Sequence, residues 1–365
     1  MMKKGKILLF STLGLMLIGC SHSGQVTKAH ETTTIDSALQ AFVDSAVRSE
    51  METINAYEGQ ALVMEVSTGA IKSLVGIQRS SDSLCARADV ITHQQEMGSL
   101  MKVPTLLAAM ETGRIKLTDS IETGGGVWPM EGYLMKDHNW RRGGYGKLTY
   151  EQALEFSSNI AISRALQKAF VMNVNKYLSM LDAMSFGQPD SIEGIVGLRP
   201  NVYSSPKDSD WVNSRFIFHA IGYERFMSPI QMLTFYNAIA NGGKMVKPTL
   251  FERTPEVINE QIARKEFIEE MQTALYHVVS QGLGKKAGTE VTNVAGKTGT
   301  AQLISETDGD GQNAYLLSFC GYFPAKNPRY SIIVCLNKKG LPASGGGMAG
   351  PVFSQIAEYM VNRKM

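Results

Sequence analysis

The order of helix-like and strand-like segments is the feature that most constrains the fold of this 365-residue chain. An amphipathic helix begins near Ala38, and two strands joined by a tight turn follow over 60–66 and 70–75. A mostly helical region comes next, at about 97–281. Three further strands follow it, over 292–302, 315–322 and 330–336. A sheet divided in sequence by a helical region predicts an α/β chain of the α+β type.

Short connections between consecutive strands predict antiparallel pairing. We therefore expect a five-stranded antiparallel sheet flanked by helices, with an inserted all-helical subdomain. Gly-rich and Pro-containing loops at 122–147 and 186–210 interrupt that insertion. Because Pro is favoured at the first position of a helix, we expect the final helix to begin at Pro351.

The first twenty residues are typical of an export signal. Lys3, Lys4 and Lys6 form a basic start, and the apolar run over 7–18 is too short to span a bilayer comfortably. The run ends just before Cys20, where small residues precede the Cys as in the lipobox of bacterial lipoproteins. In that resemblance the Cys thiol is acylated; the alternative is a plain signal peptide with an incidental Cys.

These observations predict three parts of the chain. Residues 1–19 would be a lipoprotein signal peptide, 20–36 a lipidated Cys and a flexible polar tether, and 37–365 the folded domain. The protein would then be exported and held by its lipid to a bacterial membrane, with the domain on the extracytoplasmic, periplasmic side.

Composition excludes several classes of protein. Hydrophobic residues make up 44% and charged residues 19%, which is ordinary for a globular fold. No apolar run reaches about 18 residues, so a multi-pass membrane protein is excluded. Lys and Arg total 36 against 34 Asp and Glu, and three of the lysines fall in the export signal. This near-neutral balance argues against nucleic acid as the main partner.

Cysteine and histidine usage points to neither a disulfide framework nor a metal centre. After Cys20 only Cys85, Cys320 and Cys335 remain, and three is an odd, sparse set. Cys320 and Cys335 lie in neighbouring apolar strands, where a pair is feasible but buried free thiols are favoured. The six histidines show no ligand spacing, so we expect no metal and no other cofactor.

The first candidate catalytic pattern is S-x-x-K at Ser99 and Lys102. Apolar residues continue it as a helix, so the two side chains share one helical face. A neutral Lys there can accept the Ser hydroxyl proton, which requires burial or a nearby cation to lower its pKa. The pattern is common, and it recurs at Ser204 and Lys207 in a Pro- and Asp-containing stretch predicted to be a loop.

Two further patterns follow along the chain. Ser157, Ser158 and Asn159 lie after a short helical run; such clusters usually only cap helices. The rarer pattern is K-T-G-T at the start of a strand, where a Lys and two hydroxyls suit a carboxylate and the Gly lets a ligand approach the backbone. It consists of Lys297, Thr298, Gly299 and Thr300.

The order and spacing of the three patterns resemble the S-x-x-K, S-x-N and K-T-G set of penicillin-recognising serine enzymes. From about residue 57 to the C-terminus, the chain resembles the transpeptidase domain of class B penicillin-binding proteins. The likeness extends to segments 64–71, 220–223, 228–232, 240–243, 247–248, 295–302, 321–324 and 328–330. It implies a serine β-lactamase/transpeptidase-like fold.

The resemblance also implies residue roles. Ser99 would be the acyl-accepting nucleophile and Lys102 its base, with Ser157 relaying a proton. Asn159 would hold the substrate amide and Lys102. Among the residues of the third motif, Lys297 would supply positive charge that depresses the pKa of Lys102. Thr298 and Thr300, with Gly299 between them, would bind the terminal carboxylate of the substrate. The backbone N–H groups of Ser99 and Thr300 would bind the oxyanion that forms during the reaction.

The implied reaction is acyl transfer on peptidoglycan. D-Ala-D-Ala stem peptides would be substrates, and β-lactams would acylate the same Ser. Class B proteins usually carry a transmembrane helix and a pedestal domain, whereas we expect only the lipid anchor and tether here. No glycosyltransferase region is recognisable, so such an enzyme would be a separate partner.

Two other readings stay open. A D,D-carboxypeptidase or β-lactamase uses the same fold, and Glu193 stands 34 residues after Asn159, where class A β-lactamases place a water-activating Glu. Its neighbours lack the Leu-Asn that positions that Glu. The second reading is a non-catalytic β-lactam sensor or envelope adaptor, although all three motifs are intact.

Overall fold

The computed structural model describes residues 32–303 and 313–365, except Asp82 and Glu131. The predicted signal peptide, Cys20 and most of the predicted tether lie outside the described residues. Within the described part, Thr34 is buried and its amide donates to the Leu250 carbonyl at 2.9 Å. Its hydroxyl donates to the Ile71 carbonyl at 2.7 Å. The end of the predicted tether is therefore packed on the domain, because its Thr side chain finds buried backbone partners.

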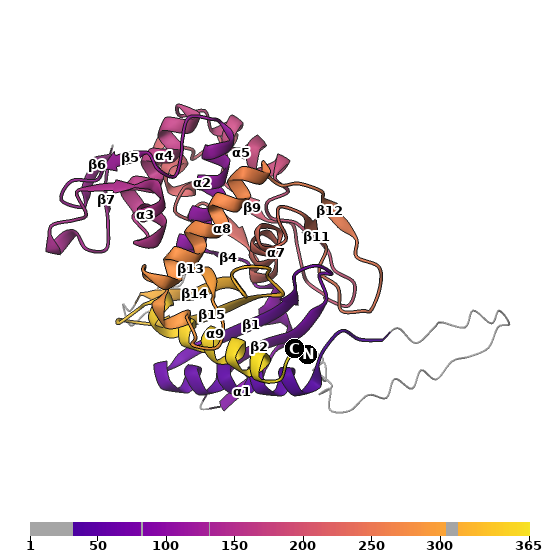
Figure 1. The fold of residues 1–365 in the computed structure, drawn as a ribbon. Coiled ribbons are helices and arrows are strands. Elements are labelled where there is room, and N and C mark those ends of the chain that lie inside the picture. The colour runs from indigo at the N-terminus through magenta and orange to yellow at the C-terminus, as the bar shows by residue number, and fades with distance from the viewer. Residues whose placement is uncertain (1–31, 82, 131, 304–312) are drawn as a thin grey trace, which may run out of the picture. The chain divides into compact units, whose positions relative to one another are not determined.

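The predicted split sheet is confirmed. An antiparallel sheet runs in the order β13-β14-β15-β1-β2-β3, so the early hairpin joins the late strands where β1 pairs with β15 (Figure 1). The strands are β1 Ala56–Glu65, β2 Ile71–Ser80, β3 Ser83–Ala86, β13 Ala295–Leu303, β14 Ala314–Phe323 and β15 Tyr330–Lys339. The predicted five strands are one too few, because β3 is a four-residue, largely exposed edge strand with no alternating apolar pattern.

Helices cover both faces of the sheet, which explains why the central strands β1, β14 and β15 are buried on both sides. On β15, Ile332, Val334 and Leu336 face the core formed with α1 and α9, whereas Ile333 and Cys335 face the core formed with α2, α7 and α8. Figure 1 shows α1 and α9 side by side beneath the sheet. The helices of these layers are α1 Ser37–Ile54, α2 Lys102–Glu111, α7 Pro229–Ala240, α8 Lys265–Ser280 and α9 Gly345–Asn362.

The inserted region is not all-helical, contrary to the prediction. Its helices are joined by short strand pairs, such as the β6–β7 hairpin that projects at the upper left of Figure 1. These strands are two to four residues long, too short to show a period in the sequence. The other helices are α3 Tyr150–Glu155, α4 Asn159–Phe170, α5 Val174–Ala183 and α6 Asn213–His219, with 3₁₀ turns η1 Ala88–Thr92, η2 Gly98–Met101, η3 Trp140–Arg142 and η4 Lys285–Ala287. The short strands are β4 Gln95–Glu96, β5 Ser120–Glu122, β6 Val127–Met130, β7 Tyr133–Lys136, β8 Lys147–Thr149, β9 Val202–Tyr203, β10 Arg225–Met227, β11 Met245–Val246 and β12 Val257–Asn259.

The last helix begins earlier than predicted. Ser344 caps α9 by accepting a hydrogen bond from the Gly347 amide at 3.0 Å, and Pro351 lies inside the helix. The first three residues of the helix are glycines, and Gly is a poor helix former, so the sequence did not predict a helix there. A Cβ on Gly345 would lie 1.9 Å from the Gly299 carbonyl oxygen, so Gly allows the helix to begin directly against β13.

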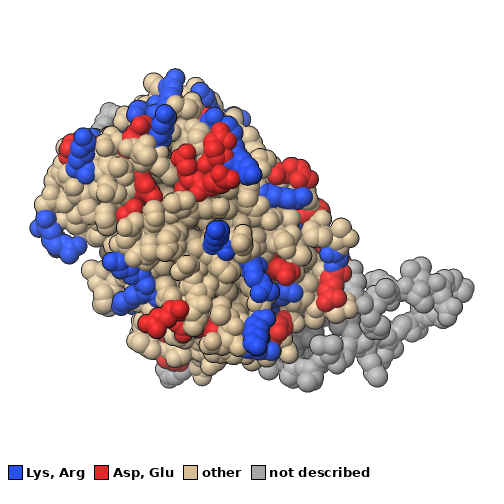
Figure 2. Space-filling view, viewed as in Figure 1, with Lys and Arg blue, Asp and Glu red and all other residues tan. Residues whose placement is uncertain are grey.

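None of the helices formed by the described residues combines the length and apolar character needed to span a membrane. Acidic and basic side chains are intermixed over the face shown in Figure 2. Cys85, Cys320 and Cys335 are free thiols, and the last two are buried, as predicted.

Candidate active site

One cavity brings the three sequence motifs together. It has a volume of about 370 Å³. Its lining includes predicted residues from η2, from the turn before α4, from α4 and from β13, and other residues that the sequence did not single out. The predicted residues are Ser99, Ser157, Asn159, Thr298 and Thr300; the others are His138, Leu283, Ala343, Ser344 and Gly346. Lys102 and Lys297 lie behind this lining, where both are fully buried.

Ser99 is placed by a tight turn packed on β13. The residue before it, Gly98, has a φ of +53°, and its amide donates to the Gly222 carbonyl at 3.3 Å. A Cβ at Gly98 would lie 2.8 Å from Ala301 Cβ, so the turn sits on the strand only because this side chain is absent. Ser99 is half-buried, and its Oγ makes no hydrogen bond to another described residue.

Lys102 opens α2 and reaches the second motif. Its Nζ donates to the Ser157 carbonyl at 2.6 Å, to Ser157 Oγ at 3.0 Å and to Asn159 Oδ1 at 2.7 Å. When Lys102 is charged, the three protons of its ammonium group match these three acceptors. When Lys102 is neutral, its amine can donate to two of them and has a lone pair that can accept a proton. The structure therefore brings Lys102 into contact with Asn159, as the resemblance implied, and with Ser157 as well.

The electrostatics of Lys102 follow from its burial. Loss of hydration lowers its pKa from 10.5 to about 7, against the opposing effect of the Asp137 carboxylate. Near neutral pH, a large fraction of Lys102 is thus unprotonated and able to accept a proton. Burial is one of the two causes that the sequence analysis allowed; the other, a nearby cation, is the role that the resemblance implies for Lys297.

Lys297 is held differently. Its Nζ donates to the Thr298 carbonyl at 3.0 Å and to Thr298 Oγ1 at 3.2 Å. Burial first, and the charge of Lys102 second, hold the pKa of Lys297 well below its ordinary value. A bound carboxylate would oppose both effects, because an opposite charge favours the protonated amine.

Gly299 also serves the packing between β13 and the turn that carries Ser99. A Cβ there would lie 2.1 Å from Ser318 Oγ and 3.0 Å from Leu100 Cγ. The missing side chain therefore lets the turn that carries Ser99 pack against the sheet. Next to it, Thr300 is exposed in the cavity, and its Oγ1 accepts a hydrogen bond from the Gly345 amide at 3.0 Å, which ties β13 to the start of α9.

Asp137 is a positioning residue that sequence reasoning missed. It is fully buried and accepts hydrogen bonds from the Asn159 amide at 2.6 Å and the Ile160 amide at 3.1 Å. Ser158 Oγ also donates to it, at 2.9 Å. A carboxylate at the first turn of α4 is favoured by the helix dipole and fixes the orientation of Asn159. The only hint in the sequence is an acidic residue in a Gly-rich loop.

His138 was also missed. It lines the cavity beside Ser157, and the Tyr145 hydroxyl lies 3.1 Å from its Nε2. Burial, with the charge of Lys102 next, lowers the pKa of His138. A neutral imidazole there offers a hydrogen bond to a ligand without adding charge beside the two lysines.

Glu193, the residue that supported a β-lactamase, lies outside this cavity. Its carboxylate accepts a hydrogen bond from Arg253 at 3.0 Å and lines a separate pocket with Lys247 and Pro248. It is therefore in no position to activate water at Ser99.

Sequence comparisons identify a matching domain family and several relatives. The penicillin-binding protein transpeptidase domain, as a family model, matches residues 59–358. The chain is 27% identical over 361 residues to penicillin-binding protein PbpB of Mycolicibacterium smegmatis, covering 90% of this chain and 54% of that protein. It is 25% identical over 336 residues to the peptidoglycan D,D-transpeptidase FtsI of Escherichia coli K12, covering 88% and 54%. The chain thus spans about half the length of these curated relatives.

Solved structures give the same fold. The apo transpeptidase domain of Burkholderia pseudomallei penicillin-binding protein 3 matches with a TM-score of 0.77 and 27% identity, covering 91% of this chain and 96% of that one. Penicillin-binding protein 3 of Mycobacterium tuberculosis, solved with aztreonam, matches with a TM-score of 0.76 and 25% identity, covering 92% and 79%. The predicted resemblance to class B proteins is confirmed, and the chain belongs to the penicillin-binding protein transpeptidase domain family.

Proposed function

We propose that this protein is a serine-type peptidoglycan D,D-transpeptidase that β-lactams acylate. The observation that carries the proposal is the position of Lys102, buried, with a pKa of about 7 and bonded to Ser157 and Asn159 beneath the cavity that Ser99 lines. A buried amine one helical turn from a cavity-lining hydroxyl is the arrangement that a nucleophile and its base require. The name of the FtsI relative, a peptidoglycan D,D-transpeptidase, supports the same activity.

In the proposed reaction, Ser99 Oγ attacks the carbonyl carbon between the two D-Ala residues of a stem peptide. Neutral Lys102 takes the hydroxyl proton, and Ser157 passes a proton to the leaving amine, so free D-Ala departs. An amine of a neighbouring stem then attacks the ester carbonyl. Its proton returns to Ser99 Oγ through the same groups, which releases the cross-linked product and regenerates the enzyme.

The third motif is assigned to substrate recognition. The Thr298 and Thr300 hydroxyls would donate to the terminal carboxylate of D-Ala-D-Ala or of a β-lactam, with Gly299 between them. Lys297 would become protonated beneath that carboxylate. Asn159 would hold the substrate amide through its side-chain nitrogen, whose other contact is the Lys136 carbonyl at 2.8 Å. The backbone N–H groups of Ser99 and Thr300 would stabilise the oxyanion.

Transpeptidation is tested by product analysis. Purified enzyme with a D-Ala-D-Ala stem pentapeptide and an excess of an amine acceptor should release D-Ala and form the acceptor-linked peptide, identified by mass spectrometry. Water as acceptor gives the tetrapeptide acid instead. Release of D-Ala with only that acid formed, at every acceptor concentration, would make the protein a carboxypeptidase. Absence of any D-Ala release would favour the adaptor reading.

We also propose that Cys20 is lipidated after removal of residues 1–19, leaving a tether that ends near Thr32. This would anchor the enzyme at the periplasmic side of a bacterial membrane, where it would work beside a separate glycosyltransferase. The lipobox-like end of the apolar run supports the proposal. We expect cells to incorporate labelled palmitate into the wild-type protein and not into Cys20→Ser. Equal labelling of the two proteins would contradict the assignment.

A further inference from the structure

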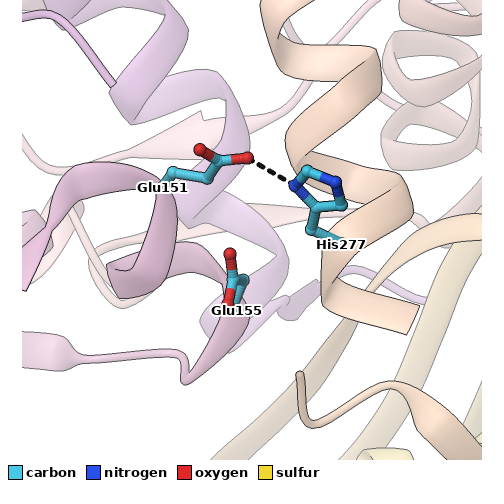
Figure 3. Close-up of side chains that lie close together, drawn as sticks. All are labelled: Glu151, Glu155 and His277. Carbon is cyan, nitrogen blue, oxygen red and sulfur yellow. Dashed lines mark hydrogen bonds and ion pairs between the residues drawn. The ribbon is translucent and has the colours of Figure 1, made fainter. Parts of the chain in front are cut away.

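Three metal-binding side chains that the mechanism does not use converge between α3 and α8. Glu151 and Glu155 lie four residues apart on α3, and His277 projects from the last turn of α8. Their ligand atoms all lie within 4.8 Å of one another. Figure 3 shows His277 and both carboxylates directed toward a common space, with Glu151 Oε1 2.6 Å from His277 Nδ1.

The charge in this cluster is not balanced. The Glu155 side chain is only 7% exposed, and no other described residue donates a hydrogen bond to its carboxylate. His277 contacts Glu151, so a single imidazole faces two acids. Burial, together with the charge of Glu151, raises the pKa of Glu155. A buried carboxylate that points at a second one is costly unless a cation lies between them.

We propose that Glu151, Glu155 and His277 bind one Zn²⁺ ion. Two carboxylates and an imidazole form a neutral complex with a divalent cation, and Zn²⁺ accepts this mixture of oxygen and nitrogen ligands. Mg²⁺ and Ca²⁺ prefer oxygen ligands alone, so the imidazole disfavours them. Three protein ligands leave a fourth tetrahedral position for water.

Small movements would complete the coordination. Ligand atoms about 2.0–2.1 Å from a tetrahedral Zn²⁺ lie roughly 3.3 Å apart. The Glu151–His277 contact at 2.6 Å would therefore open slightly as the ion takes its place between the two ligand atoms, and Glu155 would move inward. Side-chain rotation can supply these changes, because Glu151 and His277 are each about one-third exposed.

The ion would stabilise the part of the active-site cavity that Ser157 and Leu283 line. Glu155 is two residues before Ser157, and its carbonyl accepts a hydrogen bond at 3.0 Å from the amide of Leu283, which lines the cavity. Joining α3 to α8 would therefore hold the turn that positions Ser157. We assign the ion a structural role, since none of its three ligands lines the cavity.

Zinc titration of the full chain in detergent, after treatment with chelator, tests the proposal. Calorimetry should show one saturable Zn²⁺ site in the wild-type protein, and zinc should raise its Tm. Glu155→Gln and His277→Gln should each weaken that site at least about 100-fold and abolish the Tm rise. Glu151→Gln, at a more exposed position, provides a third variant should either of these fail to fold.

Controls separate this site from adventitious zinc binding. His93→Gln removes a similar Glu–His contact, that of His93 with Glu58 at 3.2 Å, at a place outside the cluster between α3 and α8, and should bind zinc like the wild type. Mg²⁺ in place of Zn²⁺ should leave Tm unchanged. Penicillin acylation of every variant reports an intact active site, independently of zinc. Zinc affinity that is unchanged in Glu155→Gln and His277→Gln, or absent in the wild type, would overturn the proposal.

Discussion

Replacing Ser99 by Ala is expected to abolish covalent labelling by a fluorescent penicillin, a loss of at least about 10⁴-fold in acylation rate. The substitution removes the only atom that the proposed mechanism allows to attack the β-lactam carbonyl. It should leave the fold intact, because Ser99 Oγ makes no hydrogen bond to another described residue. Labelling followed on denaturing gels, with circular dichroism as a check on folding, measures both effects.

The chain supplies a matched control for this experiment. Ser204 and Lys207 form a second S-x-x-K pattern, but it lies in a loop and turn after β9, and neither residue lines the cavity. Ser204→Ala should label like the wild type. Retained labelling in Ser99→Ala, or its loss in Ser204→Ala, would show that the nucleophile is misassigned.

Replacing Lys102 by Met should slow acylation by about 10²–10⁴-fold, the usual contribution of a general base. Met is close to Lys in length and tolerates the buried site, but it has no lone pair able to take the Ser99 proton. Ser157 and Asn159 lose a hydrogen-bond donor, so their positions must be checked by the Tm of the variant. Lys207→Met is the matched control and should acylate normally.

The pH dependence of acylation gives an independent test of Lys102. Its pKa is lowered to about 7, and only the neutral amine accepts a proton. The acylation rate should therefore rise about tenfold per pH unit below pH 7 and level off above it. Stopped-flow measurement between pH 5 and 8 checks this profile. A flat profile in the wild type, or an unchanged slope in Lys102→Met, would contradict the role of Lys102 as base.

The sequence predicted those parts of the site whose residues lie close together in short sequence motifs. Ser99 and Lys102 are three residues apart, so helical geometry alone places them on one face. The division of the sheet was also readable, because β1, β2, β13, β14 and β15 are nine or ten residues long and were recognisable as strands. Order and spacing then allowed the motifs to be combined, and the structure brings Ser99, Ser157, Asn159 and Thr300 to one cavity.

The parts that were missed depend on contacts that no local pattern records. Asp137 lies 21 residues from Ser158, its hydrogen-bond partner, and within a loop. His277 lies 126 residues from Glu151, so histidine spacing along the chain gave no sign of their cluster. The sequence left the cause of the lowered pKa of Lys102 open between burial and a nearby cation for a related reason: burial is a property of the packed domain, whereas the Lys297 charge was visible in the motif.

The most direct measurement of the central claim is the intact mass of the protein over time after addition of benzylpenicillin, followed by peptide mapping. The account predicts a single adduct with the mass of the whole drug, located on Ser99 and stable for much longer than its formation takes. An adduct that disappears while the drug is hydrolysed would show a β-lactamase instead. An adduct on any other residue, or none on folded protein, would contradict Ser99 as the acyl-accepting nucleophile.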